Sequence, residues 1–185
     1  MFEAIAHEEH SAGAVFFGAS LWLGLAPPVF AFLGASRFGW NVGVVDPLFL
    51  TTRELFGMSA AYFAALLFGF MSTAVISQWM ASTYGARRSL GAHFALITAV
   101  GAPLALGSVA HLYPHLVVNF VVFVPVLIWS LYLLYSGLPI ALGVSPERGM
   151  LMASSIVAYL LVGAVSLLGL TVVLWSYGIG PKIWV

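Results

Sequence analysis

The stretch Val117–Arg148 reads VVNFVVFVPVLIWSLYLLYSGLPIALGVSPER, and it decides the fold class. Its first half is a long apolar run around Pro125, of the length that a bilayer-spanning helix needs. Trp129, Tyr132 and Tyr135 follow one helical turn apart, so their rings share one face near the end of the run. Amphipathic rings favour the membrane–water boundary. The stretch therefore predicts a transmembrane helix that ends at the membrane surface.

The second half of the stretch predicts a break and a new helix. Gly137 and Pro139 favour an interruption, because glycine is permissive and proline cannot donate the next backbone hydrogen bond. Ser145 is a favourable N-cap, Pro146 suits the first helical position and Glu147 suits the first turn. We therefore predict a helix–loop–helix between two spans.

Composition indicates a membrane protein. Of the 185 residues, 62% are hydrophobic and 6% are charged, with a mean hydropathy of +1.07, whereas soluble domains carry about a quarter charged residues. Six Lys and Arg balance six Asp and Glu, so there is no basic surface for nucleic acid. Without cysteine there is no disulfide framework and no thiolate metal site. The fold class that follows is all-α, a polytopic integral membrane protein.

The hydrophobic pattern predicts one membrane domain over residues 1–185, a bundle of five transmembrane helices with proline kinks. Five spans place the two termini on opposite sides of the membrane. Pro27 and Pro28 are expected to bend the first span. The predicted spans are 14–34, 58–80, 91–112, 116–136 and 150–177.

The loop predicted over 35–56 is rich in aromatic and aliphatic residues. We expect it to lie along the membrane interface, with a short amphipathic helix that follows Asp46 and Pro47 and has Asp46 as its N-cap. The alternative is that it forms the wall of a pocket or a face that meets a partner.

Small residues recur at every fourth position of the second and third spans. Such residues let helices approach closely in lipid, where no hydrophobic force drives helices together. We expect the two stripes to face each other as an antiparallel pair; the alternative is that one stripe is reserved for the helix of another protein. The stripes consist of Gly57, Ala61, Ala65, Gly69, Thr73 and Ser77 in the second span, and Gly91, Ala95, Ala99, Pro103 and Gly107 in the third.

Arg87 and Arg88 lie in the short polar turn between these spans. Adjacent arginines at a membrane surface are candidates for binding an anionic lipid headgroup. The alternative is that they only fix the topology, as cations beside a span do.

The histidines do not predict a metal or haem site. His93 and His111 lie at opposite ends of one span and cannot share a metal ion. His111 and His115 are close enough to bracket one site, but no other span supplies a histidine at that face, so a haem held wholly by this chain is not expected. His7 and His10 lack the four-residue step of a zinc motif. We predict no cofactor and no metal.

No catalytic constellation is apparent either. Ionisable residues deep in a span usually mark proton or ion pathways, and the predicted spans lack them. Serine and threonine residues in the spans are expected to form hydrogen bonds between helices. We therefore predict that the protein is not an enzyme.

The exit of the fourth span resembles bacterial members of the Yip-domain family, the Ypt-interacting-protein membrane family. The resemblance covers nearly the whole chain and implies a bacterial cytoplasmic (inner) membrane with a cytoplasmic N-terminus. Lys and Arg are equally divided between the two sides and do not decide the orientation. Eukaryotic relatives associate with Rab-type GTPases, but we do not expect their long polar N-terminal region here. The matching residues are Tyr132, Leu133, Leu134, Tyr135, Gly137, Leu138, Pro139, Pro146 and Arg148.

Three functional hypotheses follow. The first is a non-catalytic protein that acts through helix–helix contacts, as an accessory or assembly subunit or a scaffold of a larger membrane complex. The second is a small oligomeric channel or transporter walled by proline-bent spans. The third is a membrane enzyme or cofactor carrier that uses the histidines. We favour the first, with membrane lipids and other membrane subunits or a second copy of the chain as partners, and no nucleic acid.

Overall fold

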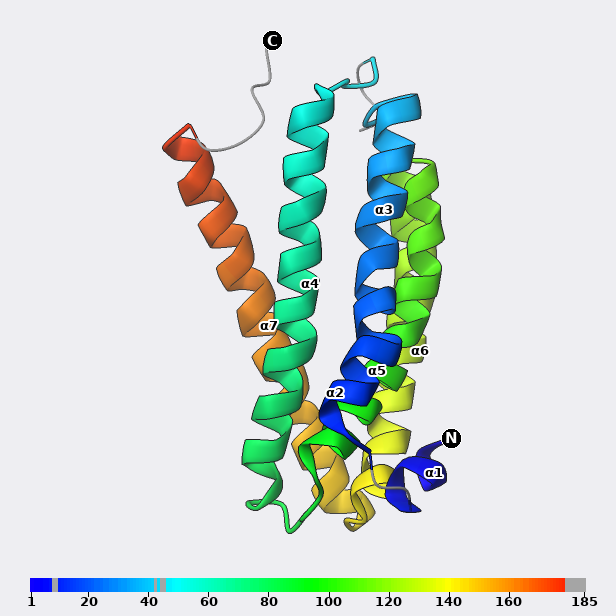
Figure 1. Ribbon diagram of the computed structural model, residues 1–185, viewed down its shortest axis with the longest axis vertical. Helices are drawn as coiled ribbons and strands as arrows, with labels where there is room; N and C mark the ends of the chain where they lie inside the picture. The colour runs from blue at the N-terminus through cyan, green and yellow to red at the C-terminus, as the bar shows by residue number, and fades with distance from the viewer. Residues whose placement is uncertain (8–9, 42, 44–45, 179–185) are drawn as a thin grey trace.

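The computed structural model describes residues 1–7, 10–41, 43 and 46–178. Figure 1 shows long helices that run side by side and alternate in direction. Five helical segments are long and apolar enough to cross a membrane, and each overlaps one predicted span. The prediction of an all-α polytopic membrane protein is therefore confirmed. The five segments are Ala12–Phe38, Thr52–Ala81 (α4), Leu90–Leu112, Leu116–Leu142 (α6) and Pro146–Ser176 (α7).

Two of these segments contain a change of helix type. The first consists of α2 (Ala12–Val15), the π-helical segment η1 (Phe16–Ser20) and α3 (Leu21–Phe38). The third consists of α5 (Leu90–Gly107) and the 3-10 segment η2 (Ser108–Leu112). A π segment inside an α-helix is uncommon and redirects the side chains that follow it.

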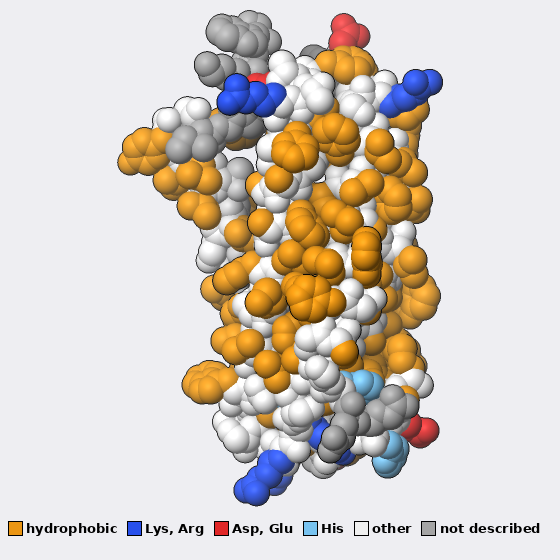
Figure 2. Space-filling view, viewed as in Figure 1, with side chains coloured by type: hydrophobic (Ala, Val, Ile, Leu, Met, Phe, Trp, Pro, Cys, Tyr) orange, Lys and Arg blue, Asp and Glu red, His pale blue; other side chains and the backbone are white. Residues whose placement is uncertain are grey.

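The short helix α1 (Phe2–His7) and the end of α7 lie at opposite ends of the bundle (Figure 1). Arginine side chains gather at both ends, and between them the visible surface is a band of apolar side chains without charged residues (Figure 2). This distribution is the one that a bilayer requires, because the hydrocarbon layer excludes charges. We call the end that carries α1 the N-terminal end, and the other the far end.

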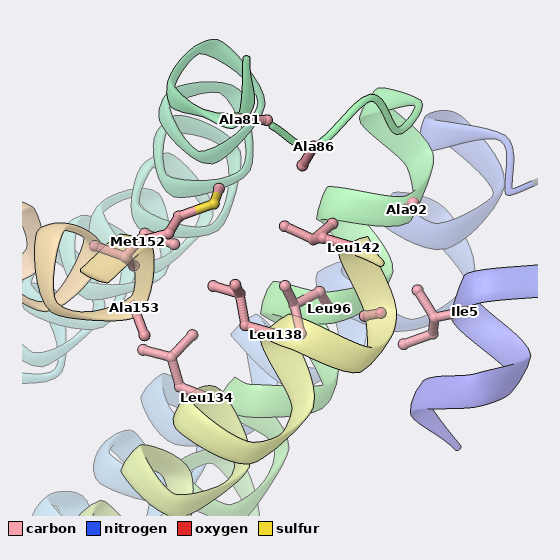
Figure 3. Close-up of a cluster of buried hydrophobic side chains, with 12 residues drawn as sticks. Ile5, Ala81, Ala86, Ala92, Leu96, Leu134, Leu138, Leu142, Met152 and Ala153 are labelled. Atoms are coloured by element: carbon pink, nitrogen blue, oxygen red, sulfur yellow. The ribbon is translucent and has the colours of Figure 1, made fainter. Parts of the chain in front are cut away.

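The main core lies at the N-terminal end, where α1, α4, α5, α6 and α7 converge. Figure 3 shows Leu134, Leu138 and Leu96 pointing toward Met152 and Ala153 of α7. The side chains of this cluster are 0% to 6% exposed. Ile5 fixes α1 against the cluster. A second, smaller cluster of Ala74, Phe94 and Ile97 joins α4 to α5, with residues of the first span packed against it.

Helix α7 leaves the bundle after its first third. Its buried residues are Gly149, Met152, Ala153 and Ile156, and from Val157 to Tyr177 the structure shows none. Figure 1 shows α7 leaning away from α4 toward the far end. The helices are therefore packed at one end of the bundle and separated at the other.

The connection between the first two spans is shorter than predicted, because α3 continues to Phe38 and α4 begins at Thr52. The prediction of a helix capped by Asp46 was wrong. Thr51 caps α4 instead: its hydroxyl accepts a hydrogen bond from the Glu54 backbone N–H, and the Glu54 carboxylate accepts one from the Thr51 backbone N–H at 3.0 Å. This reciprocal capping box satisfies two backbone donors, whereas a lone Asp–Pro pair satisfies fewer. Residues 42 and 44–45 of this loop lie outside the described residues.

The predicted interruption at Gly137 and Pro139 was also wrong. Helix α6 continues through both and ends at Leu142, with Gly143 in the left-handed conformation at φ 67°. The Pro139 carbonyl accepts hydrogen bonds from the N–H groups of Gly143 and Val144. Proline removes one backbone donor, and a span tolerates that loss when its neighbours pack well. The helix ends at the glycine that can adopt a positive φ.

Candidate functional face at the N-terminal end

The motif residues of the α6–α7 exit lie toward the N-terminal end of the molecule. Gly137 is the position at which α1 docks: a Cβ there would collide with the ring of Phe2. Gly149 likewise allows α7 to pack closely against α6, because a Cβ there would lie 2.6 Å from Cγ of Pro139. The two glycines therefore set how closely α1 and α7 approach α6.

The remaining motif residues orient the hairpin between α6 and α7. The Tyr135 hydroxyl lies 3.0 Å from Oγ of Ser154, which links the two helices. Ser145 and Pro146 begin α7 as predicted, with Ser145 as the N-cap residue and Pro146 in the first turn. Tyr132 is 67% exposed on the outside of α6.

Arg148 connects the motif to the turn that carries Arg87 and Arg88. Its guanidinium lies over Gly85 of that turn, with Nη1 2.7 Å from the position of a Cβ. In the opposite direction, Nη2 of Arg88 lies 3.4 Å from the position of a Cβ on Gly143. Each arginine thus reaches across to the other turn. The structure thus links Arg148 of the family motif to the turn of Arg87 and Arg88, two features that are separate in the sequence.

Buried polar side chains lie behind this face. Oγ of Ser77 and Nδ1 of His93 are 2.8 Å apart, and both side chains are fully buried between α4 and α5. Oγ of Ser20 and Oγ1 of Thr98 are 2.6 Å apart and join the end of η1 to α5. Within the described part of the chain, Nε2 of His93 has no hydrogen-bond partner.

The pairing of His93 was not anticipated, although a sequence signal for it exists. Ser77 and His93 are equally distant in sequence from Gly85, and two antiparallel helices joined by a turn place such residues opposite each other. The partnership of Ser20 with Thr98 has no comparable signal, because it depends on the π segment that turns Ser20 toward α5.

At its two ends, the α5 stripe of small residues faces segments other than the α4 stripe. Gly91 lies against the backbone of His10 and Ala12, and a Cβ on Gly107 would lie 2.9 Å from Val126 of α6. Ala95 and Ala99 pack on the main core cluster, to which α4 contributes Ala81. The ends of the α5 stripe therefore contact the N-terminal segment and α6.

In α4, the two ends of the stripe face different surroundings. Thr73 and Ser77 are buried, whereas a Cβ on Gly57 or on Gly69 would meet nothing within 4 Å. At 3.6 residues per turn, each four-residue step rotates by about 40°, so the stripe turns through roughly half a revolution along the helix. Its first part, Gly57, Ala61, Ala65 and Gly69, contains no buried residue.

The far end holds a separate histidine cluster. The side-chain amide of Asn119 donates to the carbonyls of Tyr113 and His115, and its oxygen faces Nδ1 of His111. His115 stacks on Tyr113 with the rings 5.9 Å apart. The rings of His111 and His115 therefore have different partners, although Asn119 contacts both residues. The described residues contain no group of three potential metal ligands.

Comparison with known proteins identifies the family. A family model described as the Yip1 domain matches residues 1–168. The chain belongs to the Yip1 domain family. The resemblance at the α6–α7 exit is therefore confirmed, and the motif residues lie within the matched range.

Two relatives from Escherichia coli are similar over most of the chain. The inner membrane protein YohC of strain K12 is 32% identical over 158 residues, which cover 85% of this chain and 81% of that protein. The same protein of strain O6:H1 CFT073 matches to the same extent. No solved structure matches the chain. Together with the five candidate spans, these relatives confirm the prediction of a bacterial inner membrane protein.

Proposed function

We propose that this Yip1-family protein is a non-catalytic membrane protein that acts through lateral helix contacts, as an accessory or assembly subunit or scaffold of a larger membrane complex. The observation that carries the proposal is the set of glycines in α4 and α7 that approach no other part of the described chain. A Cβ would meet nothing within 4 Å at Gly57, Gly69, Gly163 or Gly169. Helices associate in lipid where small residues permit close approach, so these faces suit the helix of a partner.

The distribution of buried contacts supports the same proposal. The N-terminal end is fixed by the main core cluster, whereas the second half of α7 contacts little of its own chain. A protein with a rigid base and an open far end presents helix faces without having to unfold its core. The exposed Leu161, Val165 and Leu168 offer a further apolar surface, on the face of α7 opposite Gly163.

The channel alternative requires a polar path across the membrane. Four of the buried polar side chains in the described spans instead form two local pairs, Ser77 with His93 and Ser20 with Thr98. Each pair is a hydrogen bond between two helices, and this supports a role for these side chains in helix packing.

Cysteine crosslinking tests the proposal with little background, because the chain contains no cysteine. Gly69→Cys and Gly163→Cys are introduced singly, and crosslinking is carried out in membranes at native expression level. We expect both variants to give a crosslinked species of fixed mass and stoichiometry. Phe120→Cys is the matched control, because Phe120 is 64% exposed on α6 and lies outside the proposed faces.

Crosslinking at the same low level from all three positions would refute the proposal, since it would indicate random collisions in the membrane. Purification of the wild-type chain in mild detergent supplies the second readout. A fixed ratio to larger subunits supports the accessory role. Recovery as a lone chain without position-dependent crosslinks contradicts it, and a homo-oligomer that conducts ions would favour the channel.

A further inference from the structure

We propose that Arg87, Arg88 and Arg148 form a binding site for the phosphate headgroup of an anionic phospholipid. The proposal is independent of the lateral contacts above. The three residues are exposed and come from two segments that are distant in sequence. Both segments lie at the N-terminal end, where Arg148 reaches the turn that carries Arg87 and Arg88.

The crossing of the side chains brings these charges together. Arg148 belongs to α7 and lies over Gly85, while Arg88 belongs to the turn before α5 and lies over Gly143. Both glycines have positive φ angles, 82° and 67°, and neither has a side chain that would keep a guanidinium away. The two turns therefore present guanidinium groups on one shared surface.

The cluster retains its positive charge in the described structure. No ion pair joins any of the three arginines to a carboxylate of residues 1–7, 10–41, 43 or 46–178. The neighbouring Glu147 carboxylate is hydrogen-bonded to its own backbone N–H and to Ser145, at the start of its helix. A guanidinium offers a planar fork of N–H donors that fits a phosphate bidentately, so the guanidinium groups of Arg88 and Arg148, with Arg87 next to Arg88 in the turn, suit a phosphate group.

The surroundings favour a lipid over a soluble anion. Trp79, near the end of α4, is 76% exposed, and Leu151, in the second turn of α7, is 62% exposed. Leu151 follows Arg148 by three residues and Trp79 precedes Arg87 by eight, and both lie on the membrane side of the arginines. A phospholipid in this leaflet places its phosphate at the arginines and its acyl chains along the apolar side chains. Free phosphate would contact the arginines alone.

The test measures binding of phosphatidylglycerol to the purified full chain in mild detergent, with phosphatidylcholine as the uncharged reference. In the variant R87Q/R88Q/R148Q we expect the affinity for phosphatidylglycerol to fall on the order of a hundredfold, since each arginine near a membrane surface contributes about fivefold. The control R37Q/R53Q removes the two described arginines of the far end and is expected to leave the affinity unchanged. Lysine at the three positions is expected to restore part of it, because it keeps the charge and loses the fork.

Each other outcome overturns the proposal or part of it. An unchanged affinity in the triple variant, or an equal loss in the control, means that the arginines act only through general charge or topology. Inorganic phosphate that displaces phosphatidylglycerol at equal concentration means that the ligand is a free anion. If the triple variant does not fold by circular dichroism, the single variants R87Q, R88Q and R148Q decide, each with about a fivefold loss expected.

Discussion

The two ends of this bundle are held together in different ways. At the N-terminal end, five helices share one core, in which Leu96, Leu138 and Met152 are fully buried. At the far end, α7 has no buried residue from Val157 to Tyr177, and its Gly163 approaches no other part of the described chain. The unpacked part of α7 is its more apolar part, since Glu147 and Arg148 lie in its first turn and no charged residue follows up to Ser176, so hydropathy does not explain the difference.

The contrast shows what packs helices in a membrane. Because lipid is as apolar as leucine, helices associate where their surfaces fit and where polar groups pair. The N-terminal end has both features: Gly137 and Gly149 admit their neighbours closely, and Tyr84 pairs with Ser155 at 2.7 Å. The far half of α7 has small residues without a neighbour. A small residue is thus a condition for close approach and does not itself provide the contact.

The largest expected effect comes from removing a core side chain. Leu138→Ala leaves a cavity in the main cluster and should lower the free energy of unfolding by about 2–4 kcal/mol. Leu161→Ala is the matched control, since Leu161 is 63% exposed on α7, and it should change stability little. Denaturation in mixed micelles measures both. Equal losses would mean that α7 is packed along its whole length.

The docking of α1 is tested by filling its glycine. Gly137→Val should destabilise by about 1–3 kcal/mol, because the new side chain collides with the ring of Phe2. In a Phe2→Ala background the same substitution should cost less, as the double-mutant cycle isolates the pair. An identical cost in both backgrounds would show that α1 does not pack there.

A smaller effect is expected from the buried hydrogen bond between α4 and α5. Ser77→Ala leaves Nδ1 of His93 without its partner and should cost about 1 kcal/mol. Ser176→Ala at the end of α7 is the control, because that hydroxyl bonds only locally, to the Val173 carbonyl. If both variants have wild-type stability, the Ser77–His93 pair does not hold the helices together.

The smallest effect has the opposite sign. Gly163→Ala should stabilise by about 0.5–1 kcal/mol, because alanine is the better helix former and has open space at this site. Gly149→Ala should destabilise, since its Cβ would press on Pro139. A loss of stability in Gly163→Ala would show that another helix already occupies that face.

Much of the fold was predictable from the sequence. Apolar length determines a span almost alone, because the bilayer sets the length of a helix, and the prediction for each of the five overlaps a helix of the structure. The start of α7 was also predictable, since Ser145, Pro146 and Glu147 act locally. Helix ends at which local sequence signals compete with tertiary packing were not predictable. Pro139 argued for a break, yet tertiary packing and Gly143 moved the end of α6 to Leu142.

The candidate site was predictable only in parts. The sequence indicated Arg87 and Arg88 by their position and Arg148 by the family motif, but their meeting depends on how two turns pack. The partner of each stripe was not predictable either. A four-residue repeat places small residues such as Gly91 and Gly107 at regular intervals along α5. Each four-residue step rotates the side chain by roughly 40° around the helix axis, and this rotation decides which neighbour each residue meets.

Distances between α4 and α7 at the two ends test the central claim most directly. Spin labels are placed on cysteine pairs in lipid nanodiscs, one pair at Ser82 and Met150 and one at Phe56 and Trp175, and pulsed electron resonance measures each separation. We predict a short, narrow distribution at the N-terminal end and a longer, broader one at the far end. Equally short and narrow distributions at both ends would contradict the account, because α7 would then be packed along its length.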